Sequence, residues 1–247
     1  MYDEQTVFGI HPVTELLKQR LSSIDHVYFD KEKKSAQLFE IMKICRKERL
    51  SYSQVPEAVI RQMCRVTHHQ GVVALCSVLP YHPVEKLAEI SSGKEAPLFI
   101  LPASIEDTGN LGAVIRSSVA LGADAVLLER KHTAPLNASV AKGSAGMVEH
   151  IPVIRPKNLE GVIGDLKTAG FNVIGADMKN GQPPHSMDFT LPTVLILGGE
   201  HRGIPPYLLR LCNAITSIPM SSAAQSLNVS ATAAILLYEI ASQRAAR

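Results

Sequence analysis

The sequence predicts an α/β fold in two parts, a small α/β unit followed by a larger unit with a mostly parallel sheet. Three observations carry this prediction. From residue 98 onward, short apolar runs alternate with helical patterns, as expected for parallel strands covered on both faces. Two of the helical patterns end at a glycine, Gly122 and Gly170, where a helix commonly terminates. Before them, residues 78–96 carry prolines and a Ser-Ser-Gly run, which predicts a linker between domains at 1–77 and 97–247.

The front part alternates short helical and strand patterns. In chain order, the expected elements are a helix at 11–20, a strand at 26–29, a helix at 36–48, a helix at 57–64 and a strand at 72–77. His69-Gln70-Gly71 stand directly before the last strand and would turn the chain into it. Within residues 78–96 we expect one short helix at most.

The back part repeats strand and helix. The expected strands are 98–102, 125–128, 151–154, 172–176, 193–197 and 214–218, and the expected helices are 110–121, 158–169 and 228–244. Most of the strand runs are apolar throughout, which is typical of strands buried on both faces.

Composition and cysteine usage exclude several classes of protein. Hydrophobic residues make up 46% of the 247 residues and charged residues 19%, which excludes an intrinsically disordered chain. No apolar run approaches the about 20 residues of a membrane span, so we expect no membrane partner. The acidic start, with no apolar run after it, favours the cytoplasm. Four scattered cysteines indicate reduced thiols, and the spacing of Cys64, His68, His69 and Cys76 fits no standard zinc site, so we expect no metal.

The net charge of +2 says little about partners, but its distribution is uneven. Residues 31–49 hold seven Lys or Arg against three Glu, a local charge of +4 on one predicted helix and its approach. Such a run is either a solvated helix face or a patch that follows nucleic-acid phosphates.

Ligands of open parallel sheets bind at the carboxyl ends of the strands, so the loops there are the candidates for chemistry. The first follows the strand at 98–102. In it, Asn110 is a good N-cap for the next helix, and Gly112 would let another backbone approach closely. Arg116 stands in an otherwise apolar helix, where it either pairs with Glu106 or Asp107 or anchors a phosphate.

The second loop, Gly198-Gly199-Glu200-His201-Arg202-Gly203, follows a buried strand. It resembles a phosphate-binding turn but matches neither the P-loop nor the dinucleotide pattern. The third loop follows Ile218 and is long and polar for a strand-to-helix connection. Ser226 or Asn228 could simply cap the last helix.

In this order, the three loops resemble the signature motifs of the SpoU, or TrmH, family of RNA ribose 2′-O-methyltransferases, within the SPOUT superfamily. The first motif, N-x-G-x-x-x-R, is matched by Asn110, Gly112 and Arg116. The second, G-x-E-x-x-G, is matched by Gly198, Glu200 and Gly203, and the third, S-L-N-V-S, by residues 226–230. The likeness covers about 96–247 and extends more weakly to residues 8–13 and 69–71. Thr108 and Ser222 depart from the family's usual residues.

The resemblance implies a C-terminal domain with a deep trefoil knot, a ribosomal-protein-like RNA-binding domain before it, a homodimer, and S-adenosylmethionine as cofactor. The implied cofactor-binding residues are Gly175, Leu197, Gly198, Gly199, Glu200, Gly203, Ile218, Pro219, Met220, Ser226, Leu227 and Asn228. No metal is needed, because the sulfonium of the cofactor is already a good leaving group.

The implied reaction is methylation of a ribose 2′-hydroxyl in structured RNA, with 23S rRNA the first candidate. That hydroxyl is a poor nucleophile, so a group must lower its pKa or accept its proton. Arg116, held against the adjacent phosphate, is our candidate; Asn110 would orient the loop, and Glu200, Ser226 and Asn228 would position Arg116 and the nucleotide. The alternatives are a tRNA methyltransferase, an antibiotic-resistance rRNA methyltransferase, and a non-catalytic RNA-binding or ribosome-assembly factor on the same scaffold.

Overall fold

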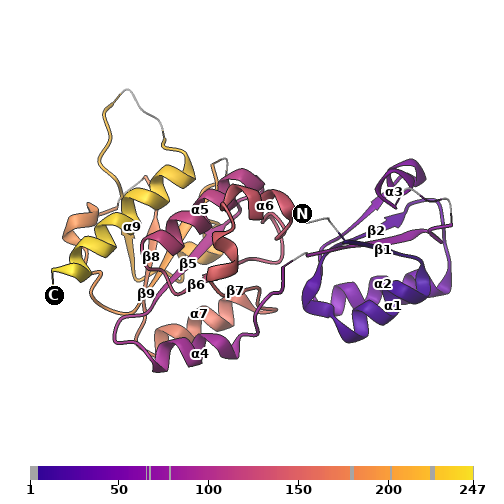
Figure 1. Cartoon of the computed structure of the whole chain (residues 1–247), viewed down its shortest axis with the longest axis horizontal. Helices are drawn as coiled ribbons and strands as arrows, with labels where there is room; N and C mark the ends of the chain where they lie inside the picture. The colour runs from indigo at the N-terminus through magenta and orange to yellow at the C-terminus, as the bar shows by residue number, and fades with distance from the viewer. Residues whose placement is uncertain are drawn as a thin grey trace. The chain divides into compact units, whose positions relative to one another are not determined.

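The computed structural model describes residues 5–64, 66, 68–77, 79–178, 181–200, 202–222 and 226–246. Two compact units divide the chain (Figure 1). The first holds the described residues up to Tyr81 together with Pro135–Ala138, and the second holds His82–Ala134 and the chain from Ser139 onward. The domain limits at 77 and 97 stay predictions.

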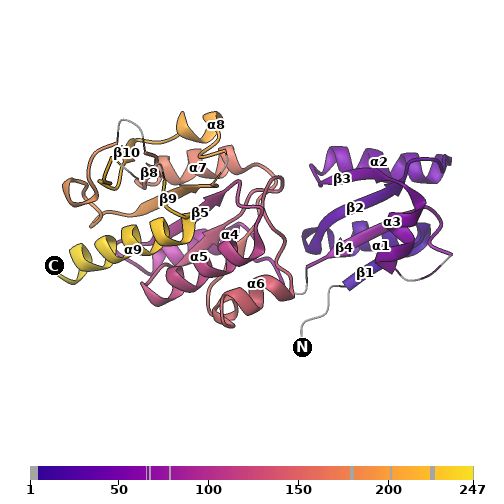
Figure 2. The ribbon, with the colours of Figure 1, turned by 90° about the horizontal axis from the view of Figure 1, so that it is seen from above.

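The first unit is a four-stranded sheet with helices on both faces (Figure 2). Its strands are β1 (Gln5–Phe8), β2 (Ile24–Asp30), β3 (Tyr52–Val55) and β4 (Val72–Cys76), in the order β1-β4-β2-β3. Its helices are α1 (Ile10–Gln19), α2 (Ala36–Lys47) and α3 (Glu57–Cys64). Strand β4 is antiparallel to both neighbours, whereas β2 and β3 run parallel.

Alternation along β4 explains the two-sided core of this unit. Val72 and Ala74 point to one face and pack with residues of α1 and α2, and Val73 points to the other and packs with Ile60 and Cys64 of α3. Because successive strand residues face opposite sides of a sheet, a wholly apolar strand needs a helical layer on each side.

The second unit contains one six-stranded sheet in which every described pairing is parallel. Its strands are β5 (Leu98–Ala103), β6 (Ala125–Leu127), β7 (Val153–Ile154), β8 (Asn172–Ala176), β9 (Thr193–Gly198) and β10 (Ala214–Thr216), in the order β10-β8-β9-β5-β6-β7. Its helices are α4 (Glu85–Ser92), α5 (Thr108–Ala120), α6 (Ala138–Gly143), α7 (Leu159–Thr168), α8 (Pro206–Leu209) and α9 (Val229–Ala245); the short α6 begins on Ala138, which belongs to the first unit.

Helices cover both faces of this sheet, with α5 and α9 on one side and α4 and α7 on the other (Figure 1). Helix α4 lies inside the segment predicted as a linker, where we allowed one short helix. Its Leu87 is only 3% exposed and packs into the core with Ile163 of α7. Residues 85–92 are therefore part of the second unit and not free chain, because burying Leu87 holds the helix against the sheet.

All six strands expected in the back part exist, and Gly122 and Gly170 follow the ends of α5 and α7 with φ of +80° and +92°. Strands β1 and β3 and helices α6 and α8 were not predicted. The trefoil knot stays a prediction.

The four cysteines are free. Cys64, Cys76 and His69 are all buried, and the Nδ1 of His69 accepts a hydrogen bond from the Gly71 backbone N–H at 3.2 Å. Among the described residues, no group of three or more His, Cys, Asp or Glu side chains is arranged to hold a metal ion. In the same part of the chain, no helix is both long and apolar enough to cross a bilayer.

Candidate active site

Asn228 joins the three candidate loops of the second unit. Its Nδ2 donates a hydrogen bond to Asn110 Oδ1 at 3.0 Å, and it also donates to Glu200 Oε1. Its Oδ1 accepts from the Ser230 backbone N–H at 2.9 Å, which caps the N-terminus of α9. One amide therefore ends the third loop and ties it to the first and second.

The sequence predicted Asn110 as the N-cap of its helix, and this prediction is wrong. Helix α5 begins at Thr108, and its N-cap is Asp107, whose side chain accepts a hydrogen bond from the Asn110 backbone N–H at 2.7 Å. Since Asp107 satisfies the first turn, the Asn110 side chain is available to accept from Asn228.

Glycines allow the loops to come this close. A Cβ atom on Gly198 would lie 2.4 Å from the backbone of Gly203 and Ile204, so the second loop folds tightly onto its own start. A Cβ atom on Gly199 would lie 2.1 Å from the Ser104 carbonyl oxygen, in the loop after β5. The close backbone approach expected at Gly112 is confirmed, because the backbone of Gly143 would be 2.8 Å from a Cβ there. Each site excludes any residue but glycine.

A first cavity of about 360 Å³ opens at this edge of the sheet. Of the residues implied to bind a cofactor, it is lined by Gly198, Gly199, Glu200, Gly203, Ile218, Met220, Ser226 and Leu227. Gly175, Leu197, Pro219 and Asn228 are not in its wall. Leu197 is fully buried in the sheet, and Gly175 leaves room for Cys212 and Ile204 to pack.

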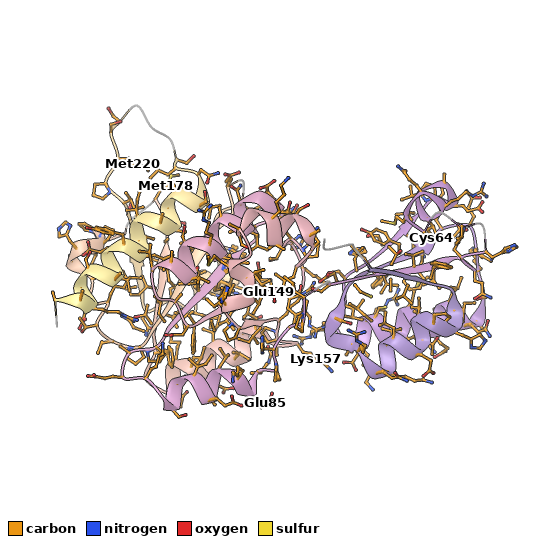
Figure 3. All side chains as sticks on the ribbon, viewed as in Figure 1. Cys64, Glu85, Glu149, Lys157, Met178 and Met220 are labelled. Carbon is orange, nitrogen blue, oxygen red and sulfur yellow. The ribbon has the colours of Figure 1, made fainter. Side chains whose placement is uncertain are left out.

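Several walls of the first cavity were not predicted. Asp177 and Met178 follow β8, and Thr232 reaches the cavity from α9. Figure 3 shows Met178 and Met220 at the same end of the second unit. The position of Asp177 just after a buried strand was a usable signal, because the carboxyl ends of parallel strands share one edge.

A second cavity of about 290 Å³ adjoins the first. Its walls include Ser104, Glu106 and Asn110, and it shares Glu200, Arg202 and Val229 with the first cavity. Glu200 and Arg202 therefore stand at the junction of two adjoining spaces. Arg202 was not selected from the sequence, where a lone arginine in a glycine-rich loop carries no signal of its own.

Arg202 is held at this junction by a neighbour from another loop. Its Nη1 lies 3.1 Å from His132 Nδ1, and the same Nδ1 lies 3.4 Å from Glu106 Oε1. Glu106 thus faces His132, and among the described residues the ion pair between Arg116 and Glu106 or Asp107, one of the two alternatives from the sequence, is not formed.

Arg116 lies farther along α5 and is exposed. Within the described residues it has no ion pair or hydrogen bond, and it lines neither of the two cavities. The contacts expected for it with Glu200, Ser226 or Asn228 are likewise not formed. Its guanidinium is therefore free to meet a partner outside this chain.

A buried carboxylate fixes the rim of the second cavity. Glu129, which follows β6, is only 7% exposed; its Oε2 accepts from the Ser104 backbone N–H at 2.7 Å, and its Oε1 accepts from the Tyr207 hydroxyl. Burial and the Glu129 carboxylate raise the pKa of Tyr207, so the phenol stays protonated and donates. Ser104, at φ +55°, is thereby held in the left-handed region.

Comparison with known proteins shows the family to which this chain belongs. Residues 97–238 match the model of the SpoU rRNA Methylase family, and residues 6–82 match that of the RNA 2′-O ribose methyltransferase substrate-binding domain. The chain belongs to the SpoU rRNA methylase family. It is 30% identical over 245 residues to the 23S rRNA (guanosine-2′-O-)-methyltransferase RlmB of Ralstonia nicotianae, covering 99% of this chain and 98% of that one.

Solved structures agree with the SpoU assignment. The AdoMet-bound rRNA methyltransferase from Sinorhizobium meliloti is 25% identical, with a TM-score of 0.60 over 96% of this chain and 86% of that one. The SpoU methyltransferase AviRb from Streptomyces viridochromogenes, in complex with AdoMet, is 24% identical and has the same fold, with a TM-score of 0.62 over 98% and 91% of the two chains.

The role of Asn228 in holding the first and second loops together can be tested by mutation. Serine at 228 can still cap α9, but its single, shorter hydroxyl cannot keep both hydrogen bonds to Asn110 and Glu200, so Asn228→Ser should keep the free energy of unfolding within about 1 kcal/mol. Methyl transfer should fall about tenfold or more, because the first and second loops lose their common anchor. Chemical denaturation and initial rates check this. Ser242→Ala, near the far end of α9, is the matched control, and equal rates in Asn228→Ser and wild type would contradict the role.

Proposed function

We propose that this protein transfers a methyl group from S-adenosylmethionine to a ribose 2′-hydroxyl of 23S rRNA. The observation that carries the proposal is the convergence of the three motif loops on Asn228, which places Asn110 and Glu200 at two adjoining cavities. The choice of 23S rRNA follows the RlmB relative, which matches this chain over nearly its whole length.

The first cavity fits the cofactor. Its volume of about 360 Å³ lies in the range of small-molecule sites, and its walls combine apolar side chains with the backbone of glycines. When bound, S-adenosylmethionine supplies an electrophilic methyl group on a positively charged sulfur. Ile218 and Leu227 would exclude water from its apolar parts, and the backbone of Gly198 and Gly199 would hydrogen-bond its polar edges.

The second cavity would hold the acceptor nucleotide. Asn110 would orient the ribose, and a guanidinium against the neighbouring phosphate would stabilise negative charge on the 2′ oxygen. Arg116 is the candidate from the motif, and Arg202 is the guanidinium that lines the cavity. Transfer would form a bond from the 2′ oxygen to the methyl carbon and break the bond from that carbon to the sulfur, so that S-adenosylhomocysteine would leave. The proton of the hydroxyl would pass to Glu200, which lines both cavities.

RNA binding by the first unit and dimerisation complete the proposal. The seven cations between residues 31 and 49 are all exposed, which favours a phosphate-binding patch on α2 and the segments directly before and after it. Helix α9 exposes Ile235 and Tyr238, at 43% and 67%, on the side away from the sheet, and a second copy of the chain would cover them. Sedimentation velocity should then give a homodimer. We place the protein in the cytoplasm, where its RNA is made.

Ribose methylation of RNA from a strain lacking this gene tests the function. The purified protein, labelled S-adenosylmethionine and unmethylated 23S rRNA should give one new 2′-O-methylated nucleotide by nuclease digestion and mass spectrometry. tRNA from the same strain serves as the comparison substrate. Label found in tRNA alone would show that the substrate is tRNA and not 23S rRNA. No label in either RNA would favour a non-catalytic RNA-binding factor.

A further inference from the structure

We propose that α2 and β3 of the first unit form a surface that stacks unpaired RNA bases, with Phe39 as its platform. The inference rests on the proposed function, since it names how the RNA substrate is recognised. It concerns residues of the first unit only, whereas the candidate methyl-transfer site is formed by residues of the second. The surface consists of Phe39, Met42, Lys43 and Arg46 on α2 with Tyr52 and Gln54 on β3.

These residues form one continuous stripe. On α2, positions 39, 42, 43 and 46 follow the three- and four-residue spacing of a single helix face. Two contacts place that face beside β3: Arg46 Nε donates to the Tyr52 hydroxyl at 2.8 Å, and Gln54 Nε2 lies 4.0 Å from Met42 Sδ. Figure 2 shows α2 running along β3. The stripe therefore joins a helix face to an edge strand.

Phe39 is exposed where packing does not need it. The core side of α2 is filled by Leu38, Ile41 and Cys45, which are all buried, while Phe39 is 53% exposed. Lys43 Nζ lies 5.0 Å from the centre of the Phe39 ring, as in cation–π pairs, and also bonds Glu40 at 2.8 Å. An aromatic face bordered by a cation is what single-stranded RNA binders offer to a base and its phosphate.

Tyr52 makes the neighbouring part of the surface rigid. The rings of Tyr52 and Phe29, a core residue, form a T-shaped contact with a centroid distance of 6.0 Å and an interplanar angle of 88°. The Arg46 guanidinium carbon lies 6.0 Å from the same ring, and its Nε is held by the Tyr52 hydroxyl. Arg46 thus presents a fixed guanidinium plane, and such planes also stack on bases.

Charge decides for RNA over a protein partner. The segment from 31 to 49 carries a net +4, its Lys and Arg side chains are all exposed, and Lys43 and Arg46 belong to the stripe itself. Phosphates are the complement of that charge, whereas unstacked bases are the complement of the exposed ring. A paired helix hides its base faces, so the surface fits a loop or other unpaired stretch of RNA.

Fluorescence anisotropy of the full-length protein with two probes tests this. The probes are a labelled single-stranded U12 RNA and a 12-base-pair RNA duplex of mixed sequence. Phe39→Ala should weaken U12 binding about fivefold or more and leave duplex binding within about twofold, with the salt dependence unchanged. Phe39→Trp should restore U12 binding, because stacking needs an aromatic face and no particular ring.

Charge variants separate stacking from phosphate contacts. Lys47→Ala should weaken both probes and lower the slope of log K against log salt by roughly 0.7 to 0.9. Lys18→Ala, an exposed cation paired with Glu15 on α1 of the same unit, is the matched control and should change neither. Thermal melts check folding, and an exposed position such as Phe39 should tolerate alanine.

The inference is overturned if Phe39→Ala binds U12 like wild type, or if it weakens U12 and duplex equally. Methylation of 23S rRNA by the wild-type protein is measured alongside. If the wild-type protein methylates 23S rRNA and Phe39→Ala does not change U12 binding, the stacking surface is disproved and the proposed function is supported. A selective loss of U12 binding with no methylation keeps the surface and removes the function.

Discussion

One methyl group at residue 198 should abolish binding of S-adenosylhomocysteine. In Gly198→Ala the new Cβ would lie 2.4 Å from the Gly203 carbonyl carbon and the Ile204 nitrogen, both of which are backbone atoms and cannot rotate away. The second loop must then open. Four of its residues line the first cavity, namely Gly199, Glu200, Arg202 and Gly203, so the cavity would change shape. Isothermal titration calorimetry should show affinity lowered about 100-fold or lost.

Two further variants make this result interpretable. Gly164→Ala lies in α7, where nothing is within 4 Å of a new Cβ, and it should bind like wild type and gain about 0.5 kcal/mol of stability or more. Thr232→Phe fills the first cavity from α9 and changes no residue of the second loop, so it keeps the test open if Gly198→Ala does not fold. Full affinity in a folded Gly198→Ala or in Thr232→Phe would disprove the cofactor site.

The resemblance implied that Gly198 binds the cofactor, and the structure gives the reason that a glycine stands there. In the structure, the hydrogen of Gly198 faces its own loop, and Ile218 and Leu227 are among the residues that line the cavity. A motif names the residues of a site, but which neighbour a glycine makes room for is fixed only by the folded loop.

Strand prediction succeeded where burial is two-sided. The apolar runs of β5, β8 and β9 are buried along nearly their whole length, so the sequence records the parallel sheet directly. Strands β1 and β3 were missed because they are the two edges of the first sheet. An edge strand has one neighbour and tolerates polar side chains, and Tyr52–Val55 is only partly buried.

Local capping chemistry could not be settled from the sequence. Asp107 and Asn110 are both good N-cap residues three positions apart, and only the start of α5 decides between them. The hydrogen bond from Asn228 to Asn110 joins residues 118 positions apart. The sequence showed only that both residues belong to motifs of one family, not that their side chains meet. Arg202 and Glu129 lie outside the matched motif positions, and their roles come from the meeting of loops after β5, β6 and β9.

Arg116→Ala should lower methyl transfer by at least ~100-fold while leaving the fold and cofactor affinity intact. The exposed, unpaired guanidinium contributes little to stability, so the free energy of unfolding should change by no more than about 0.5 kcal/mol. A structural ion pair with Glu106, the competing explanation, is not formed, since Glu106 faces His132. Arg116→Lys should rescue poorly, because an ammonium lacks the planar fork that binds a phosphate with two hydrogen bonds.

Arg202 is the matched comparison, because it is a guanidinium that already lines both cavities. Single-turnover methylation of 23S rRNA by wild type, Arg116→Ala, Arg116→Lys and Arg202→Ala, with calorimetry and thermal melts alongside, separates the two arginines. If Arg116 activates the hydroxyl, its alanine variant loses the chemical step at saturating RNA, and Arg202→Ala mainly weakens RNA binding. Near-normal turnover in folded Arg116→Ala, together with a ~100-fold loss in Arg202→Ala, would instead give the activating role to Arg202. Its Nη1 lies 3.1 Å from His132 Nδ1, which holds the guanidinium at the junction of the two cavities.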